Sequence, residues 1–173
     1  MRGFFMAVMG LDQSYTSTGI CIFSDDGELI HHQLVKSEKD DTVEHDTIKR
    51  AMCISDEIVQ LVIDMNVGVV SLEGLSFGGN VGNASRNLAG LQYLIVSKLI
   101  SIGCTVKITP PTRIKKFATG SGSASKVEMF DAIPQKHKEE IELYKKTKGR
   151  YDVTDAYWLG QYWFFGLSGD ENA

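Results

Sequence analysis

The chain has 173 residues, of which 43% are hydrophobic and 23% charged, as in a single soluble globular domain, so two full domains are not expected. The apolar stretch over residues 4–11 is too short for a membrane-spanning helix or a signal peptide, so we expect a cytoplasmic protein that is neither secreted nor membrane-bound. Three cysteines without metal-ligand spacing predict buried, reduced thiols rather than a disulfide framework or a zinc site.

The net charge of −4 conceals a basic central region. Residues 75–127 contain seven Lys or Arg and no Asp or Glu, whereas the rest of the chain has all 22 acidic residues and only 11 basic ones. If this region folds onto one face, it can neutralise the phosphates of a polyanion even on an acidic protein. The alternative is a chance run of solvated basic side chains.

The first third of the chain predicts three strands and a helix. Residues 4–11 form an apolar strand that ends at Asp12, and residues 18–24 and 28–35 flank the turn sequence Asp-Asp-Gly, which predicts an antiparallel meander. Apolar residues then recur at spacings of three and four over residues 41–65, which predicts an amphipathic helix. Its predicted core-facing positions are Ile48, Ala51, Met52, Ile58, Val59, Val62 and Met65.

The rest of the chain alternates between the two kinds of element. Residues 67–72 form a continuous apolar strand that ends at Glu73, and a glycine-rich loop separates it from a helix over 84–102 and a strand over 104–109. Pro110 and Pro111 end that strand. A short helix over 126–133, a charged segment over 135–150 that is either a flexible loop or an exposed helix, and a final helix over 151–165 follow, before a tail over 167–173. This order predicts one α/β domain with a mixed five-stranded sheet, an antiparallel three-stranded meander plus parallel strands, and helices on both faces.

Four carboxylates lie at the ends of these elements. Asp12 and Glu73 terminate apolar strands, and Asp152 and Asp155 are three residues apart on one face of the last helix. A buried lone carboxylate needs a cation or hydrogen-bond donors, although helix capping alone could explain the pair on the helix. Together they predict an all-oxygen site for Mg²⁺ or Mn²⁺, in which two ions roughly 3.5–4 Å apart can promote phosphodiester hydrolysis.

Four segments of the chain, in order, resemble the motif blocks of RuvC-like Holliday junction resolvases. They are residues 9–19 (MGLDQSYTSTG), 71–74 (SLEG), 111–126 (PTRIKKFATGSGSASK) and 152–156 (DVTDA). The resemblance implies an RNase H-like fold, a homodimer and two Mg²⁺ ions per active site, with Mn²⁺ able to substitute. It also implies paired nicks in four-way DNA junctions that leave 5′-phosphates and 3′-hydroxyls, during recombination, repair or the processing of replication intermediates.

The resemblance also assigns roles to individual residues. It implies that Asp12, Glu73, Asp152 and Asp155 bind the metal ions and that Lys115 and Lys126 are catalytic residues at the scissile phosphate, with the adjacent Lys116 as an alternative to Lys115. Phe77 resembles the aromatic residue that stacks at the branch point, although it lies one residue further from the glutamate than in the bacterial pattern. The remaining predicted DNA contacts are Ser14, Arg86, Arg113 and Lys116, and the predicted dimer interface is the helix over 84–102, through Tyr93, Val96 and Ile100.

Three other functions are weighed against this prediction. Residues 10–19 also resemble the first phosphate loop of the sugar kinase, Hsp70 and actin ATPases, but those enzymes need two such domains, so no nucleotide cofactor is expected. A non-catalytic nucleic-acid-binding protein would be expected to lack some of the four acids. A nuclease of the same fold with a broader range of branched DNA or RNA–DNA hybrid substrates stays open.

Overall fold

The computed structural model describes residues 6–75, 82–146 and 149–166. Its single sheet has the strand order β3-β2-β1-β4-β5, in which β1 (Ala7–Asp12), β2 (Ser17–Phe23) and β3 (Leu29–Lys36) are antiparallel neighbours. The strands β4 (Val67–Glu73) and β5 (Thr105–Thr109) continue the sheet parallel to β1. The predicted mixed five-stranded sheet with its antiparallel meander is therefore confirmed.

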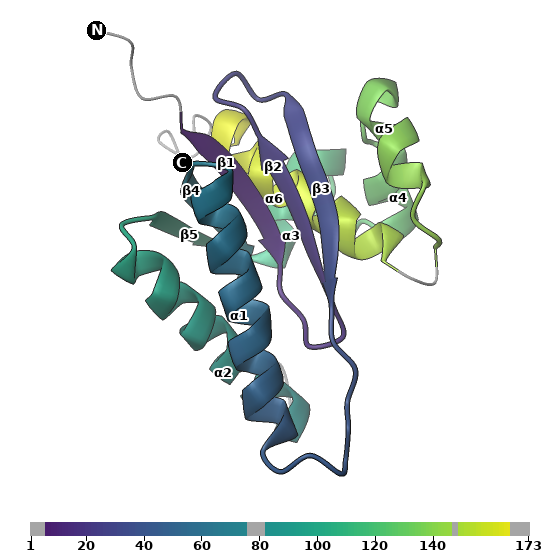
Figure 1. The fold of residues 1–173 in the computed structure, drawn as a ribbon. Coiled ribbons are helices and arrows are strands. Elements are labelled where there is room, and N and C mark those ends of the chain that lie inside the picture. Colours follow the sequence, from purple (N-terminus) through teal and green to yellow (C-terminus); the bar gives the residue numbers. More distant parts are fainter. Residues whose placement is uncertain (1–5, 76–81, 147–148, 167–173) are drawn as a thin grey trace, which may run out of the picture.

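Two long helices, α1 (Asp46–Asp64) and α2 (Asn83–Ser101), cover one face of the sheet side by side (Figure 1). The predicted apolar stripe of α1 is partly wrong, since Ile48 is 60% exposed and Met52 is 50% exposed. Ile54 and Ser55 are buried instead. They complete a second stripe of helical period with Ala51 and Ile58, and this stripe is the one that α1 turns toward the sheet and α2.

The buried side of α2 agrees better with the prediction. Leu91, Ile95 and Leu99 are fully buried, whereas Ala84 and Ile102 at the predicted ends of the stripe are exposed. Among the residues predicted for a dimer interface, Tyr93 is 75% exposed and Ile100 is 60% exposed. Val96 is half-buried and packs against the core, so it is available to a partner only in part.

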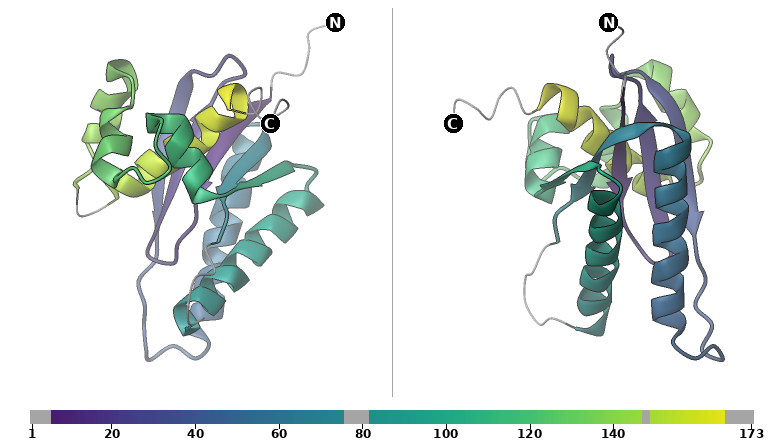
Figure 2. Two further views of the ribbon diagram at one scale, coloured as in Figure 1. Left: turned by 180° about the vertical axis from the view of Figure 1, so that it is seen from behind. Right: turned by 60° about the vertical axis from the view of Figure 1, so that its left-hand side comes forward.

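The other helices lie on the opposite side of the sheet (Figure 2). The helix α6 (Arg150–Phe165) lies directly on β1 and β2, α3 (Pro111–Thr119) and α4 (Lys126–Asp131) pack against it, and α5 (Gln135–Glu142) contacts α6 near the β3 edge of the sheet. Because α6 is covered on both sides, it is buried around much of its circumference. The helical spacing of its aromatic residues predicts core packing for Tyr157, Trp158, Tyr162 and Trp163; the first three are buried, whereas Trp163 is only half-buried.

Two of these helices extend the sequence prediction. Pro110 and Pro111 were interpreted only as the end of a strand, but Pro111 occupies the first position of α3, where a missing N–H costs nothing. The charged segment contains α5, so its helical alternative is confirmed over Gln135–Glu142. His137 and Ile141 anchor this helix in the core, which a flexible loop would not provide.

Two glycines let α6 approach the sheet closely. A Cβ atom on Gly10 would lie 1.9 Å from the carbonyl oxygen of Ala156, and one on Gly19 would lie 2.1 Å from that of Asp152. Any larger residue at either position would push the helix away. These contacts fix the height of the first turns of α6 above the end of β1, where Asp12 lies.

Two smaller expectations can be compared with the structure. None of the described helices is long and apolar enough to cross a membrane. The three cysteines are free as expected, but the expectation that all three thiols are buried holds only for Cys21, since Cys104 is half-buried and Cys53 is exposed.

Candidate active site

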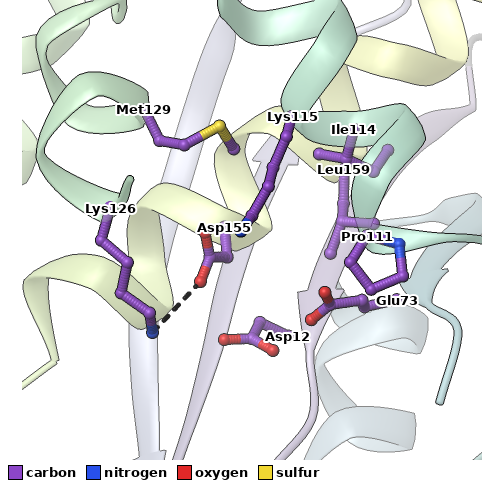
Figure 3. Close-up of a pocket in the computed structure, with 9 residues that line it drawn as sticks. All are labelled: Asp12, Glu73, Pro111, Ile114, Lys115, Lys126, Met129, Asp155 and Leu159. Carbon is purple, nitrogen blue, oxygen red and sulfur yellow. Dashed lines mark ion pairs between the residues drawn. The ribbon is translucent and has the colours of Figure 1, made fainter. Parts of the chain in front are cut away.

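A cavity of about 300 Å³ opens where β1 and β4 end and α3, α4 and α6 meet them (Figure 3). Both strands run in the same direction, so their last residues, Asp12 and Glu73, reach the same edge of the sheet. Asp155 enters from the second turn of α6 and Lys126 from the first residue of α4. The full lining is Asp12, Glu73, Pro111, Ile114, Lys115, Lys126, Met129, Asp155 and Leu159.

Three of the four predicted metal-binding carboxylates line this cavity, namely those of Asp12, Glu73 and Asp155. The fourth, Asp152, lies one turn earlier on α6, is half-buried and does not line the cavity. Its charge nevertheless acts on both Asp12 and Asp155. The structure thus gathers the predicted acids at one place, with Asp152 at its margin.

These carboxylates repel one another. Burial, followed by the charges of Asp155, Glu73 and Asp152, raises the pKa of Asp12 well above its ordinary value. Burial and the charge of Asp155 likewise raise the pKa of Glu73, and burial raises that of Asp155 despite the nearby lysines. Three neighbouring carboxyl groups whose pKa values are all raised are typical of a site that binds a cation.

Two lysines face the carboxylates. Lys126 Nζ lies 3.5 Å from Asp155 Oδ2, and although burial lowers the pKa of Lys126, the charges of Asp155, Asp12 and Asp152 raise it above its ordinary value. Lys115 also lines the cavity, and its charge lowers the pKa values of Glu73 and Asp155. Lys116 is exposed and outside the lining, so the structure places Lys115, and not its neighbour, at the carboxylates.

The donor set fits a hard divalent cation. Carboxylate oxygens are the ligands that Mg²⁺ and Mn²⁺ prefer, and here they come from three separate elements around one cavity. Within residues 6–75, 82–146 and 149–166, no three His, Cys, Asp or Glu side chains are gathered tightly enough to ligate one ion. The acids therefore line one cavity without forming a tight three-ligand cluster within these residues.

The other predicted DNA-binding residues lie outside this cavity. Arg86, in the first turn of α2, and Arg113, in the first turn of α3, are exposed. Ser14 lies in the loop after β1, where its hydroxyl accepts hydrogen bonds from the backbone N–H groups of Thr16 at 3.3 Å and Ser17 at 2.9 Å. Phe77 lies outside the described residues.

Two buried glutamines beside the site were not predicted from the sequence. Gln13 Nε2 donates a hydrogen bond to the backbone carbonyl oxygen of Glu73 at 3.2 Å, and Gln92 Nε2 donates to the same oxygen at 2.8 Å. For Gln13 the signal was its position directly after Asp12. For Gln92 no sequence signal exists, because its contact depends on how α2 packs against β4.

Comparison with known proteins identifies the family. Residues 8–146 match the model of the family described as crossover junction endodeoxyribonuclease RuvC. No curated protein sequence matches the chain. The chain therefore belongs to the RuvC family of crossover junction endodeoxyribonucleases, the nucleases that resolve Holliday junctions, and the predicted family is confirmed.

Solved structures agree in fold at low sequence identity. RuvC of Thermus thermophilus superposes with a TM-score of 0.68 at 16% identity over 95% of this chain and 97% of that one. The same protein in complex with a Holliday junction substrate gives 0.72 at 17% identity over 95% and 96% of the two chains. The yeast mitochondrial Holliday junction resolvase Ydc2 gives 0.67 at 14% identity over 95% and 81%. These matches confirm the predicted RNase H-like fold.

Proposed function

We propose that this protein resolves four-way DNA junctions by paired, metal-dependent hydrolysis of phosphodiester bonds in the cavity at the end of β1. The observation that supports this most is the convergence of Asp12, Glu73 and Asp155 with Lys115 and Lys126 on one cavity in a chain of the RuvC family. A T. thermophilus relative with the same fold is known in complex with a Holliday junction substrate. We expect the protein to act in the compartment that holds the DNA.

The carboxylates would hold two Mg²⁺ ions, with Mn²⁺ as a substitute. Asp12, Glu73 and Asp155 would hold the ions, with Asp152 at the margin of the cavity; the charges of Asp155, Glu73 and Asp152 all act on Asp12. Ions bound there would supply an activated water as the nucleophile and would stabilise the leaving 3′ oxygen.

The two lysines would bind the scissile phosphate. Lys126 is 59% exposed at its side chain and Lys115 lines the same cavity, so both ammonium groups can reach a phosphate that enters from solvent. Ile114 and Leu159 form an apolar part of the wall. An apolar wall lowers the local dielectric constant and strengthens the attraction between the ammonium groups and the negative charge that develops on the phosphate.

Two further cavities extend this site toward the N-terminal end of α2. The active-site cavity shares Asp12, Glu73 and Pro111 with a second cavity, which in turn shares Leu88 with a third cavity of about 320 Å³. The lining of the third includes one aromatic and two basic side chains, Tyr15, Lys39 and Arg50. A DNA strand that follows these cavities would pass from the cleavage site to Lys39 and Tyr15, while Arg50 is held by Ser37 and the Tyr15 carbonyl oxygen.

Paired cleavage requires two active sites, and we propose that two chains associate through the outer face of α2. Tyr93 and Ile100 are both more than half exposed there, and large apolar side chains on one helix face favour a symmetric interface. A variant with Tyr93→Glu and Ile100→Glu should sediment as a monomer, whereas Leu143→Glu, on the opposite face of the sheet, should not change the mass of the particle. A wild-type monomer at micromolar concentration in sedimentation velocity would contradict the interface.

The decisive experiment is cleavage of a labelled immobile four-way junction with Mg²⁺ or Mn²⁺, beside linear duplex, flap and RNA–DNA hybrid substrates of matched sequence. We expect symmetric paired nicks confined to the junction, with 5′-phosphate ends. Cleavage of flaps or hybrids instead would favour the broader nuclease. Tight binding of the junction without cleavage, with either Mg²⁺ or Mn²⁺ present, would favour a non-catalytic binding protein.

A further inference from the structure

The backbone of Glu73 is held from two sides by glutamine side chains. Gln13 and Gln92 both donate to its carbonyl oxygen, at 3.2 Å and 2.8 Å, and the two glutamines are only 5% and 6% exposed. They come from different elements, the loop after β1 and the middle of α2. The Glu73 carbonyl oxygen thus accepts hydrogen bonds from both of these buried side-chain amides.

This arrangement lies where the β-sheet ladder stops. The pairing of β1 with β4 ends at Leu11 and Leu72, so Asp12 and Glu73 have no backbone pairing between them. On its other side Glu73 is still paired with Thr109 of β5, and the next amide, of Gly74, donates to the Thr109 carbonyl oxygen at 2.8 Å. Gln13 therefore supplies, through its side chain, the link between β1 and β4 that the backbone no longer makes.

We propose that Gln13 and Gln92 are positioning residues that set the carboxylate of Glu73 relative to that of Asp12 by holding the Glu73 carbonyl oxygen. Gln13 directly follows Asp12, so its amide joins the chain segments that carry the two acids. Gln92 fixes the same point to the rigid core helix α2. The inference rests on the proposed function, because a defined spacing of the two carboxylates matters only if they bind an ion together.

The free end of the Gln13 amide points to the same role. Its Nε2 donates to the Glu73 carbonyl, so Oε1 is the acceptor, and among the described residues this buried atom has no hydrogen-bond partner. Gln13 also lines the second cavity, of about 170 Å³, together with Asp12 and Glu73. A buried acceptor in a polar cavity is suited to a bound water molecule. Because Gln13 also directly follows Asp12 in the chain, removal of its amide should have a larger effect than removal of that of Gln92.

Isosteric variants without the amide test the inference. Gln13→Met and Gln92→Met each leave one donor on the Glu73 carbonyl, so the single variants should fold even if the double variant does not. The matched control is Gln161→Met on α6, because Gln161 is 8% exposed and also donates to a backbone carbonyl, that of Gly27 at 3.0 Å. Gly27 lies in the turn between β2 and β3, at the end of the strands remote from the cavity.

The first measurement is binding of Mn²⁺ alone, followed by electron paramagnetic resonance, with thermal unfolding of each variant alongside. Loss of a group that orients a metal ligand commonly lowers affinity about 10- to 100-fold. We therefore expect a dissociation constant about 10-fold higher for Gln13→Met, a smaller rise for Gln92→Met, and for the double variant a rise larger than in either single variant but below about 100-fold. Gln161→Met should lose thermal stability to a similar extent and bind Mn²⁺ like the wild type.

Junction cleavage provides an independent readout. The Mn²⁺ concentration for half-maximal cleavage should rise in parallel with the dissociation constant, while the KM for the junction stays unchanged. Single variants that bind Mn²⁺ as tightly as the wild type, or that change only the KM, would overturn the inference and leave the proposed function intact. A wild-type protein that binds no Mn²⁺ would instead overturn the proposed metal site itself.

Discussion

Replacing Asp12 by asparagine should stabilise the metal-free protein while it abolishes cleavage and spares junction binding. The carboxylate of Asp12 is partly buried among Asp155, Glu73 and Asp152, and the charge of Lys126 opposes theirs on it. Burial and these neighbours raise its pKa well above the ordinary value. A carboxyl group whose pKa is raised in the fold is less stable as an anion in the folded protein than in the unfolded chain, so its charge lowers the free energy of unfolding.

The size of the effect follows from linkage. Each unit by which the fold raises a carboxyl pKa corresponds to about 1.4 kcal/mol, so removal of this charge should raise the free energy of unfolding measurably. Each kcal/mol gained corresponds to roughly 2–4 °C in Tm for a chain of this length. The destabilisation by Asp12 is fully present above its pKa in the fold and disappears below its pKa in the unfolded chain, near about 4. The advantage of the Asp12→Asn variant should therefore be largest at neutral pH and vanish in acid.

The assay is urea unfolding with EDTA or with Mg²⁺, at neutral and acidic pH. Mg²⁺ should stabilise the wild type by mass action and the variant much less. The control is Asp131→Asn, since Asp131 is exposed and pairs with Lys138 at 3.0 Å, and its loss should change stability by less than about 0.5 kcal/mol. An Asp12→Asn variant that is less stable than the wild type in EDTA at neutral pH would refute the repulsion argument, and near wild-type cleavage by it would refute the metal site.

Two further predictions concern the lysines and the approach of α6. Lys115→Met and Lys126→Met should each slow single-turnover junction cleavage by about 10²–10³-fold, because both side chains line the cavity. Lys116→Met, outside the cavity, should change the rate by less than about threefold. Equal effects at Lys115 and Lys116 would contradict the placement of Lys115. Gly19→Ala should lower the free energy of unfolding by about 1–3 kcal/mol and weaken Mn²⁺ binding, because its Cβ would lie 2.1 Å from the Asp152 carbonyl oxygen. The control Gly90→Ala, in open space on α2, should raise the free energy of unfolding by about 0.5–1 kcal/mol. Denaturant unfolding and Mn²⁺ titration measure both effects, and a Gly19→Ala variant with wild-type stability and Mn²⁺ affinity would show that the contact does not position α6.

The sequence was sufficient to locate Asp12 and Glu73 because their signal is local. A charged residue at the end of an apolar strand is visible without knowledge of the fold, and parallel strands bring such ends to one edge. The distance of Asp152 from the cavity could not be predicted in the same way. It depends on the height of α6 above β1 and β2, which Gly10 and Gly19 set through contacts with residues more than 130 positions away.

The missed elements have a similar physical origin. Pro110 and Pro111 carry the same local signal whether a strand ends there or a helix begins. The helix α3 is stabilised by tertiary packing, in which Phe117 contacts Trp158 and Tyr162 of α6. In α5 the charged residues dominate the composition, while two inward side chains, His137 and Ile141, decide the structure. A short helix with few apolar residues needs a partner surface to form, and a sequence pattern does not show that surface.

Core packing draws β1 and β4 together, whereas repulsion between the carboxylates at their ends pushes the same two strands apart. Leu11 and Leu72 are fully buried and hold β1 and β4 together, whereas Asp12 and Glu73, one residue later, repel each other. The backbone ladder stops between these two pairs, which is where mutual repulsion would separate the strands. The Gln13 amide crosses this gap, so in the proposed role it keeps the two carboxylates near each other without adding a further positive charge to those of Lys115 and Lys126. Gln13→Lys should therefore bind Mn²⁺ more weakly than Gln13→Met, because its ammonium group would compete with the ion; equal affinities would contradict this argument.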